Sequence, residues 1–430
     1  MITGKGVGAL LAALAVYFLA RLTQVGWLYL VDAILWGALA LALIVPWFGV
    51  VFISAHRSAS TKDNQKSGGP FSEGDPVTIT IALKNRLFYP RFFHSIKYDS
   101  PIAGPDGAKQ WFFIAYLSRS GSLLLESTVE AYRRGLHNLG PVILESSAPF
   151  GFFRKKRALS GPEPVLVLPR VYPLNRLLLV DGLEGWSVNA RTSRSGLDLA
   201  GSRIFVQGDS RRMVHWRNTA RSGRLMVKET EDQTNRTVHI MFDSGDVWGS
   251  GRETHFEYAI KLAASVANYA LKNRVPVRVW GSNLRGSNFA AADSSTDLEG
   301  VTLAWPDLLK SLAVAQPAGR AAMEEGLANL PTGANLFIVW SADDRQSHEN
   351  LNRALAHSGE TLVVRLEGFG EPQSTGDSAN SLEQAGSSVL TCNPGGLEQT
   401  LSDIENLGRS NDLGAYAALT GMTPVGDGPR

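Results

Sequence analysis

The stretch TVHIMFD, residues 237–243, decides the fold of the second half of this chain. It is almost continuously apolar and ends on an aspartate, which is typical of a strand buried on both faces of a parallel sheet. Residues 256–273 follow with apolar side chains at helical spacing. Further buried strands are expected at 275–281, 335–341, 361–368 and 388–392, and helices at 320–330, 347–358 and 396–407. This alternation predicts an α/β fold, a mostly parallel sheet with helices on both faces, over residues 237–408.

Length and composition are those of a protein with several folded domains. The chain has 430 residues, of which 44% are hydrophobic and 19% charged, so real cores are expected. The net charge of +2 gives no overall field that would attract nucleic acid, and we expect no nucleic-acid partner. The single cysteine, Cys392, excludes an intrachain disulfide framework and a zinc site built on cysteines.

The first 57 residues are a separate, apolar region. Residues 6–20 and 27–53 are apolar and Arg21 lies between them. About 20 helical residues cross the hydrocarbon core of a bilayer, and a helix satisfies its own backbone there. Residues 1–57 are therefore predicted to form a transmembrane helical hairpin. A cleaved signal peptide, with Lys5 as its basic start, also explains the first block, but the longer second block favours a hairpin.

Basic residues at the helix ends predict the orientation of this hairpin. Lys5 precedes the helices and Arg57, Lys62 and Lys66 follow them, whereas the turn carries Arg21. Since cytoplasmic flanks carry the excess of Lys and Arg, both ends and the soluble part are expected on the cytoplasmic side of the inner membrane.

A polar linker and a β-rich module come next. Residues 58–75 are rich in Ser and Gly, which predicts a linker. Within residues 76–175, short strands are expected at 76–85, 92–100, 110–118, 122–135, 141–146 and 164–169. Together they predict a small β-sandwich-like module. The basic run from Arg154 to Arg157 is interpreted as a solvated loop, because charge runs usually face water.

Acidic residues follow two strands of the predicted α/β sheet. Asp243 and Asp246 end the first, and Asp343 and Asp344 follow residues 335–341. Ligands of such sheets bind beyond the carboxyl ends of strands where the strand order reverses, and carboxylates there hold hard cations such as Mg²⁺. Asp243 is thus a candidate metal ligand, although Asp and Ser after a strand are also ordinary helix caps. No phosphate loop, zinc-protease or serine-hydrolase motif is present, so no catalytic residue is assigned. A metal-dependent hydrolase using Asp243, Asp246 and Asp343 remains an alternative.

An arginine-rich stretch, RIFVQGDSRRMVHWRNTARSGR, occupies residues 203–224. Its acidic neighbours Glu229, Glu231 and Asp232 favour bidentate ion pairs over a nucleic-acid surface. The spacing of Arg212, Trp216 and Ala220 predicts a short helix with one buried face, with Trp216 as a packing anchor. Residues 176–236 are therefore expected to form an ordered, ion-paired connector.

The same stretch carries a family resemblance. The pattern R-x-F-x-x-G-D-x-R-R-x-V-H-W-R-x-x-A-R-x-G-x-L-x-V-K-E, from Arg203 to Glu229, resembles the signature of the DUF58 family of bacterial and archaeal proteins. The signature residues singled out for binding or structure are Arg203, Gly208, Asp209, Arg211, Arg212, His215, Trp216, Arg217 and Arg221. Residues 132–154 also resemble the family pattern, except that Ala148 replaces its usual aspartate.

This resemblance implies a membrane hairpin, a β-rich module and a von Willebrand factor A-like α/β domain over 237–408, before a flexible tail at 409–430. Family members are encoded beside MoxR-type AAA+ ATPases and often beside transglutaminase-like membrane proteins. The resemblance therefore implies a non-enzymatic, membrane-tethered adaptor that binds such an ATPase or its client. A regulatory subunit of a transglutaminase-like membrane complex is another alternative. The family's A-like metal motif reads D-x-S-x-S, whereas this chain keeps Asp243 but has Gly245 and Val247.

Overall fold

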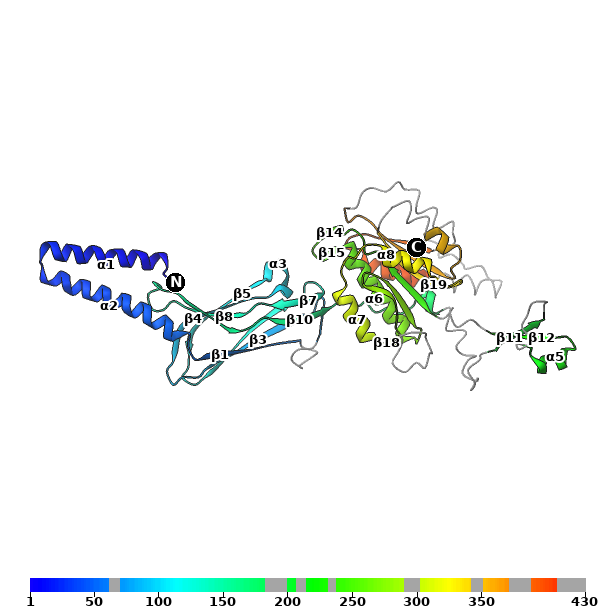
Figure 1. Cartoon of the computed structure of the whole chain (residues 1–430), viewed down its shortest axis with the longest axis horizontal. Coiled ribbons are helices and arrows are strands. Elements are labelled where there is room, and N and C mark those ends of the chain that lie inside the picture. The colour runs from blue at the N-terminus through cyan, green and yellow to red at the C-terminus, as the bar shows by residue number, and fades with distance from the viewer. Residues whose placement is uncertain are drawn as a thin grey trace, which may run out of the picture. The chain divides into compact units, whose positions relative to one another are not determined.

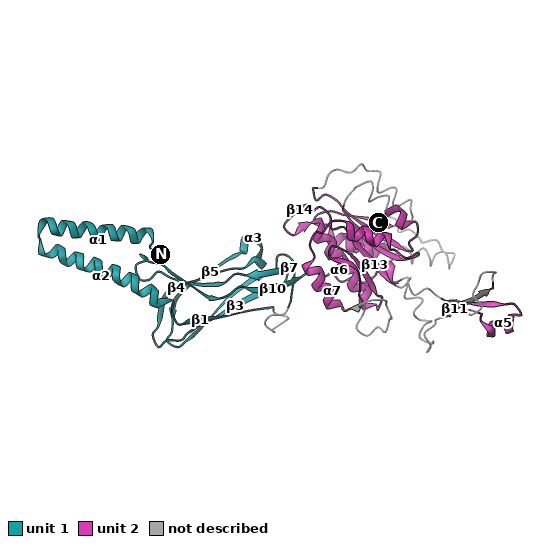
Figure 2. Ribbon diagram, in the orientation of Figure 1, with its two compact units in different colours: residues 1–170 teal, residues 171–430 magenta. Residues whose placement is uncertain are grey.

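The computed structural model describes residues 1–61, 70–181, 199–205, 214–230, 237–289, 302–341, 351–370 and 388–407. The chain divides into two compact units, Met1–Arg170 and Val171–Arg430 (Figure 2). The predicted tail at 409–430 lies outside the described residues.

The first unit begins with two helices, α1 (Gly4–Thr23) and α2 (Gly26–Gly49), which pack as a hairpin (Figure 1). Each is long and apolar enough to cross a membrane. The turn between them uses Gln24 in the left-handed region, with φ of 57°, so the chain reverses within two residues.

The hairpin ends earlier than predicted. α2 ends at Gly49 and β1 (Ile53–Thr61) follows, so Arg57 and the first residues of the expected linker are in a strand. The side chain of Arg57 is buried, with Nε 3.0 Å from Glu163 Oε2 and NH1 donating to Gly140 O at 2.6 Å. Arg57 therefore anchors the β sheets, because its charge is satisfied inside the unit. Residues 62–69 lie outside the described part.

Three sheets surround the core of the first unit. The first has the order β1-β3-β6, the second β2-β10-β7 and the third β5-β4-β8-β9. Their bounds, besides β1, are β2 (Phe71–Ser72), β3 (Pro76–Asn85), β4 (Arg91–Asp99), β5 (Lys109–Leu117), β6 (Ser122–Glu130), β7 (Gly135–Leu139), β8 (Val142–Ser146), β9 (Lys155–Ser160) and β10 (Glu163–Leu168). A short helical link, η1 (Pro101–Ala103) with α3 (Gly104–Gly107), joins β4 to β5.

Alternation explains why these strands form. Val77, Ile79, Ile81 and Leu83 are all buried on one face of β3, and they share a core cluster with residues of the other sheets. The basic run is a difference from prediction. Lys155 begins β9, which pairs with β8, so Lys155 to Arg157 lie in a strand and not in a loop, whereas Arg154, Lys156 and Arg157 do face solvent as predicted.

The second unit contains a seven-stranded sheet of order β18-β17-β16-β13-β19-β20-β21. The strands are β13 (Val238–Phe242), β16 (Val277–Gly281), β17 (Leu284–Phe289), β18 (Thr302–Leu303), β19 (Asn335–Trp340), β20 (Thr361–Leu366) and β21 (Ser388–Cys392). All neighbouring pairs are parallel except β16 with β17, which confirms the predicted mostly parallel sheet. A two-stranded ribbon, β14 (Gly249–Ser250) with β15 (Glu253–Thr254), directly precedes the helix that starts at His255.

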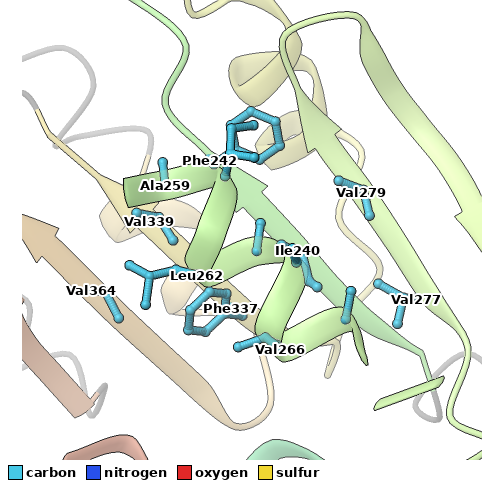
Figure 3. Close-up of a cluster of buried hydrophobic side chains, with 14 of the residues drawn as sticks. Ile240, Phe242, Ala259, Leu262, Val266, Val277, Val279, Phe337, Val339 and Val364 are labelled. Atoms are coloured by element: carbon cyan, nitrogen blue, oxygen red, sulfur yellow. The ribbon is translucent and has the colours of Figure 1, made fainter. Parts of the chain in front are cut away.

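Helices cover both faces of this sheet. Ile240 and Phe242 point into a cluster with Leu262 and Val266 of α6 (His255–Lys272), as Figure 3 shows. On the opposite face Met241 packs with residues of α8 (Ala321–Ala328). Helix α7 (Trp305–Val314) and helical residues 397–407 contribute to the first cluster. Consecutive side chains of β13 thus face different helices, which is why the strand is apolar throughout.

The arginine-rich segment forms a small substructure of its own. β11 (Leu199–Ile204) pairs with β12 (Met226–Thr230) in an antiparallel hairpin, and α5 (Trp216–Ser222) lies between them in sequence. Part of this connector, residues 206–213, lies outside the described residues.

Candidate functional site

Two places in the second unit carry the residues that the sequence singled out, and the first is the carboxyl edge of the sheet. Asp243 directly follows β13 and is 2% exposed. Its Oδ1 accepts the N–H of Gly245 at 2.9 Å and its Oδ2 accepts the hydroxyl of Ser341 at 2.9 Å. Ser341 follows β19, which pairs with β13 where the strand order reverses. Two neighbouring strand ends therefore meet at this carboxylate, as their positions in the sequence predict.

A cation from the protein itself also reaches this carboxylate. Arg320 Nε lies 3.4 Å from Asp243 Oδ2, and the Arg320 side chain is 22% exposed. Arg320 is the N-cap residue of α8, far from Asp243 in sequence. A buried carboxylate requires charge and hydrogen-bond partners, and Arg320, Ser341 and the Gly245 amide supply them here.

The loop that carries Arg320 is fastened to the end of β13. Ser244 O accepts the N–H groups of Ala318 and Gly319 at 3.0 and 2.9 Å. Ser244 Oγ donates to Gly319 O at 2.7 Å and accepts the N–H of Ser282 at 2.9 Å. Because Ser244 is fully buried, these contacts fix where the guanidinium of Arg320 can lie.

Gly245 is the position where this chain departs from D-x-S-x-S, and the geometry gives a reason. A Cβ atom at Gly245 would lie 3.1 Å from Arg320 Nε and 3.1 Å from Asp243 Oδ1. That is tighter than ordinary contact, so a serine there would push on Arg320. Glycine at 245 and arginine at 320 therefore fit together.

A metal ion fits this edge poorly. Among the described residues there is no group of three or more His, Cys, Asp or Glu side chains that could hold one. Asp246 is exposed, and Asp343 and Asp344 lie outside the described residues. The carboxylate of Asp243, the candidate Mg²⁺ ligand, is already paired with the Arg320 guanidinium.

The second place is the signature segment around α5. Arg203 lies in β11 opposite Val227, while Gly208, Asp209, Arg211 and Arg212 lie outside the described residues. His215 is the N-cap of α5, with Nδ1 accepting the N–H of Asn218 at 3.1 Å. A cap of this kind satisfies one of the orphan amides at a helix start.

Other signature residues also have structural tasks. Val214 forms a bridge with Val227, and each is 4% exposed. Gly223 ends α5 in the left-handed region, with φ of 67°, where a side chain is unfavourable. Thr219 Oγ1 accepts the N–H of Met226 at 3.0 Å, which ties α5 to β12. These contacts hold a short helix of seven residues in place.

Trp216 was predicted to be a packing anchor, and this prediction is wrong. Its side chain is 69% exposed, and α5 has no buried residue. Arg217, Ala220 and Arg221 are exposed beside it. We call these four residues the signature face. The predicted buried face at Trp216 and Ala220 instead faces outward, because Val214 and Val227, which flank α5, provide the packing.

Sequence reasoning missed Arg320 and Ser341. Arg320 precedes a helix and Ser341 follows a strand, and neither stands in a recognisable motif. Only the strand order and the fastened loop bring them to Asp243.

Comparison with known proteins bears on both places. Residues 201–331 match the family described as "Protein of unknown function DUF58". This part of the chain belongs to the DUF58 family. The DUF58 match includes the signature face and also Asp243, Gly245 and Arg320, so it covers most of both places.

A relative and two solved structures complete the comparison. "Uncharacterized protein YeaD" of Bacillus subtilis (strain 168) is 25% identical over 212 residues, 46% of this chain and 50% of the relative, so the match spans about half of that protein. An immunoglobulin-like protein from Pseudomonas aeruginosa is 13% identical, covering 27% of this chain and 95% of its own, with a TM-score of 0.17. S. aureus TarJ in complex with NADPH is 10% identical, covering 76% and 89%, also with a TM-score of 0.17. Similarity this low carries no argument about fold or function.

Proposed function

We propose that this DUF58 chain is a membrane-tethered adaptor whose signature face binds a protein partner, a MoxR-type AAA+ ATPase or its client, during the assembly or activation of other proteins. In this proposal α1 and α2 anchor the chain in the inner membrane and the second unit works on the cytoplasmic side.

The exposure of Trp216 carries the proposal. A tryptophan that is 69% exposed leaves a large apolar surface in water, which the fold itself does not require. Trp and Arg dominate the binding energy of protein interfaces, and here Arg217 and Arg221 are exposed on the same short helix as Trp216. His215, Thr219 and Gly223 meanwhile hold the helix in its conformation, so the face is presented in a fixed form.

The contacts at the carboxyl edge of the sheet, around Asp243 and called the strand-end edge from here on, favour a binding protein over a hydrolase. A hydrolase built on Asp243 would need a carboxylate free to bind a cation or activate water. The contacts of Asp243 with Arg320, Ser341 and Gly245 leave it little capacity for either task. We also propose a von Willebrand factor A-like fold for this unit, a fold associated with binding, and the order β17-β16-β13-β19-β20-β21 with an antiparallel β17 is compatible with it.

Co-purification tests the adaptor. The full chain, solubilised from membranes, should retain the MoxR-type ATPase of its own organism. A variant with Trp216→Ala, Arg217→Ala and Arg221→Ala should lower that retention at least about tenfold, since hot-spot residues cost about 2 kcal/mol or more each. Arg285→Ala, an exposed arginine on β17, is the matched control and should leave binding unchanged. Equal binding by both variants would refute the role of the signature face.

The alternatives give different outcomes in the same preparation. A transglutaminase-like membrane protein retained in place of the ATPase would favour the regulatory-subunit alternative. Hydrolytic turnover that Mg²⁺ or Mn²⁺ supports and Asp243→Ala abolishes would favour the hydrolase. The variant Arg211→Ala with Arg212→Ala extends the test to signature arginines outside the described residues.

A further inference from the structure

The end of α2 is completed by side chains that come from much later in the chain. The last carbonyl groups of a helix have no partner within it, and cations near them are favourable. In this chain three side chains form hydrogen bonds with carbonyl oxygens at and just after the end of α2. These are His94 Nε2 with Gly49 O at 2.9 Å, Arg157 NH1 with Val50 O at 3.0 Å and Arg91 NH2 with Val51 O at 3.3 Å. Strands β4 and β9 therefore meet the helix where it leaves the proposed membrane span.

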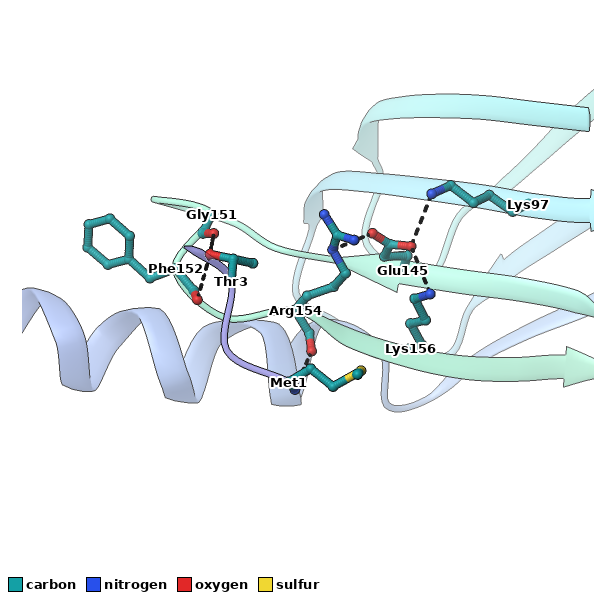
Figure 4. Close-up of polar contacts among 8 residues, drawn as sticks. All are labelled: Met1, Thr3, Lys97, Glu145, Gly151, Phe152, Arg154 and Lys156. Atoms are coloured by element: carbon teal, nitrogen blue, oxygen red, sulfur yellow. Dashed lines mark hydrogen bonds and ion pairs between the residues drawn. The ribbon is translucent and has the colours of Figure 1, made fainter. Parts of the chain in front are cut away.

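The basic run of β9 surrounds the same place. Lys155 Nζ lies 4.7 Å from the ring centre of Trp47, in the last turn of α2. The carboxylate of Glu145, 7% exposed, is approached by three cations (Figure 4). Their distances are 3.3 Å for Lys97, 2.8 Å for Arg154 and 4.0 Å for Lys156. Three cations against one carboxylate leave an excess of two positive charges, and each cationic side chain is about half exposed.

The start of α1 is fastened at the same cluster. The N-terminal amine of Met1 donates to Arg154 O at 2.9 Å, and Thr3 Oγ1 donates to Gly151 O at 2.7 Å (Figure 4). A side chain at Gly6 would overlap the carbonyl group of Phe152, so α1 approaches this loop closely. Both helices therefore join one end of the sheet β5-β4-β8-β9, and the excess charge lies at that end.

Five aromatic rings at the same end of this sheet are between 48% and 65% exposed: Phe88, Tyr89, Phe92, Phe93 and Tyr116. The exposed rings of Phe113 and Trp111 continue this row along β5. The rings of Phe88 and Tyr89 are 4.1 Å apart and those of Phe92 and Tyr116 are 5.3 Å apart. The N–H of Arg86 donates to Phe52 O at 3.0 Å, which brings the turn that carries Phe88 against the chain leaving α2.

Phe93 shows that this exposure has a conformational cost. Its φ is 55°, in the left-handed region that bulky side chains avoid. Strict alternation along β4 would bury either Phe92 or Phe93, but both are exposed. Backbone strain of this kind persists where the surroundings hold it and is concentrated at functional positions.

We propose that these residues form an exit collar that binds the head-group layer of a bilayer containing anionic lipid. The exit collar comprises Phe88, Tyr89, Phe92, Phe93, Tyr116, Lys97, Arg154, Lys155 and Lys156. The inference rests on the membrane tether of the proposed function and adds a specific lipid contact to it. Aromatic rings favour the membrane–water interface, and lysines and arginines near the surface attract anionic head groups. Continuity with both apolar helices argues for lipid as the occupant, because any residue at the end of α2 lies at head-group depth when α2 spans the bilayer.

Lipid retention on the full chain tests the cationic half of the collar. Delipidated protein in detergent is mixed with equal amounts of phosphatidylglycerol and phosphatidylcholine, and bound lipid is counted by native mass spectrometry. We expect phosphatidylglycerol to be preferred, and Lys155→Gln with Lys156→Gln to weaken that preference about fivefold for each cation removed. Lys109→Gln, at the opposite end of β5 from Tyr116, is the matched control and should change nothing. Equal retention of the two lipids, or an equal loss in the control, would overturn the proposal.

A fluorescence experiment tests the aromatic half. Ser120 N donates to Leu87 O at 2.9 Å, so the adjacent position 119 lies beside the collar turn. Arg119→Cys is labelled with an environment-sensitive dye, since Cys392 is buried, and the full chain is placed in nanodiscs. The emission should be blue-shifted relative to detergent, and Phe88→Ser with Tyr89→Ser should reverse the shift, whereas Leu136→Ser on β7 should not. An unshifted dye, or a shift that appears only when the chain dimerises, would overturn the proposal.

Extraction of membranes with alkaline carbonate distinguishes failure of the exit-collar proposal from failure of the proposed membrane tether. If alkaline carbonate releases the chain from membranes, the tether itself fails. If the chain stays inserted but shows no preference for anionic lipid, the tether stands and the exit collar is wrong.

Discussion

The strand-end edge and the signature face both present arginine, and they use it in opposite ways. At the edge, Arg320 pairs with Asp243, which is 2% exposed. On α5, Arg217 and Arg221 are exposed beside Trp216, itself 69% exposed. The edge is closed by contacts within the protein, whereas the signature face keeps its large side chains in water. The presence of an arginine in a motif therefore says little about which surface recognises a partner, because the contacts around each arginine decide that.

This contrast predicts that substitutions at the edge act on stability and substitutions on α5 act on binding. Asp243→Ala should have the largest effect on stability. It removes an ion-pair partner of Arg320 and the acceptor of the Ser341 hydroxyl and the Gly245 N–H. Breaking a buried ion pair from one side costs about 3–5 kcal/mol, and about 3 is expected here because Arg320 is partly exposed. This loss of stability is measured by hydrogen exchange of the β13 and β19 amides in the full chain.

Asp246→Ala is the matched control for Asp243→Ala. Asp246 is exposed and three residues away, so its removal should change exchange in β13 by less than about 0.5 kcal/mol. Similar losses in the two variants would mean that the edge is not the closed site that the contacts of Asp243 indicate.

The stability of the second unit is also expected to depend on pH, because of a histidine buried in the sheet. His239 of β13 is 2% exposed, and burial, followed by the charge of Arg278, lowers the pKa of its imidazole from 6.5 to about 4. Between pH 6.5 and 4 the unfolded chain binds the proton more readily, so stability is complete above pH 6.5 and falls toward pH 4. The loss should approach roughly 3 kcal/mol.

The pH prediction is tested by comparing the native chain with two histidine variants. Exchange of the β13 amides is followed from pH 7 to pH 4 in the native chain and in His239→Gln, which should lose most of the slope. His357→Gln, at an exposed histidine, should keep it. An unchanged slope in His239→Gln would show that other groups titrate.

Much of the fold was predictable because its strands are long and strongly patterned. The alternating residues 76–85 form β3, and the continuous apolar run at 237–243 forms β13, since periodicity reports burial directly. Asp243 could be placed at the edge for the same reason. Arg320, Ser341 and the collar position of Lys155 could not, because each reaches its partner through pairing between distant segments. Trp216 was misplaced because helical spacing does not say which face of a short helix is covered.

Gly245→Ser tests whether glycine at 245 and arginine at 320 depend on each other. The new side chain would lie 3.1 Å from Arg320 Nε, so we expect a loss of about 1 kcal/mol in the native chain. In an Arg320→Ala background the contacts with Arg320 are gone and only the 3.1 Å approach to Asp243 Oδ1 remains, so the serine should cost less than in the native chain. This double-mutant cycle is measured by hydrogen exchange of β13, and a zero coupling energy would remove the explanation given for Gly245.

The effect expected at His215 is confined to α5 and concerns both stability and binding. His215→Ala removes the acceptor of the Asn218 N–H and should destabilise α5 by about 1 kcal/mol, the usual worth of an N-cap. His215→Asn, which can accept the same bond, should restore most of that. If α5 presents Trp216 to a partner, His215→Ala should weaken binding about fivefold while His215→Asn binds nearly as the native chain does. Exchange at Asn218 and Thr219 is measured beside partner affinity. A loss of affinity shared by both variants, with α5 intact in His215→Asn, would make His215 itself a contact residue and the cap incidental.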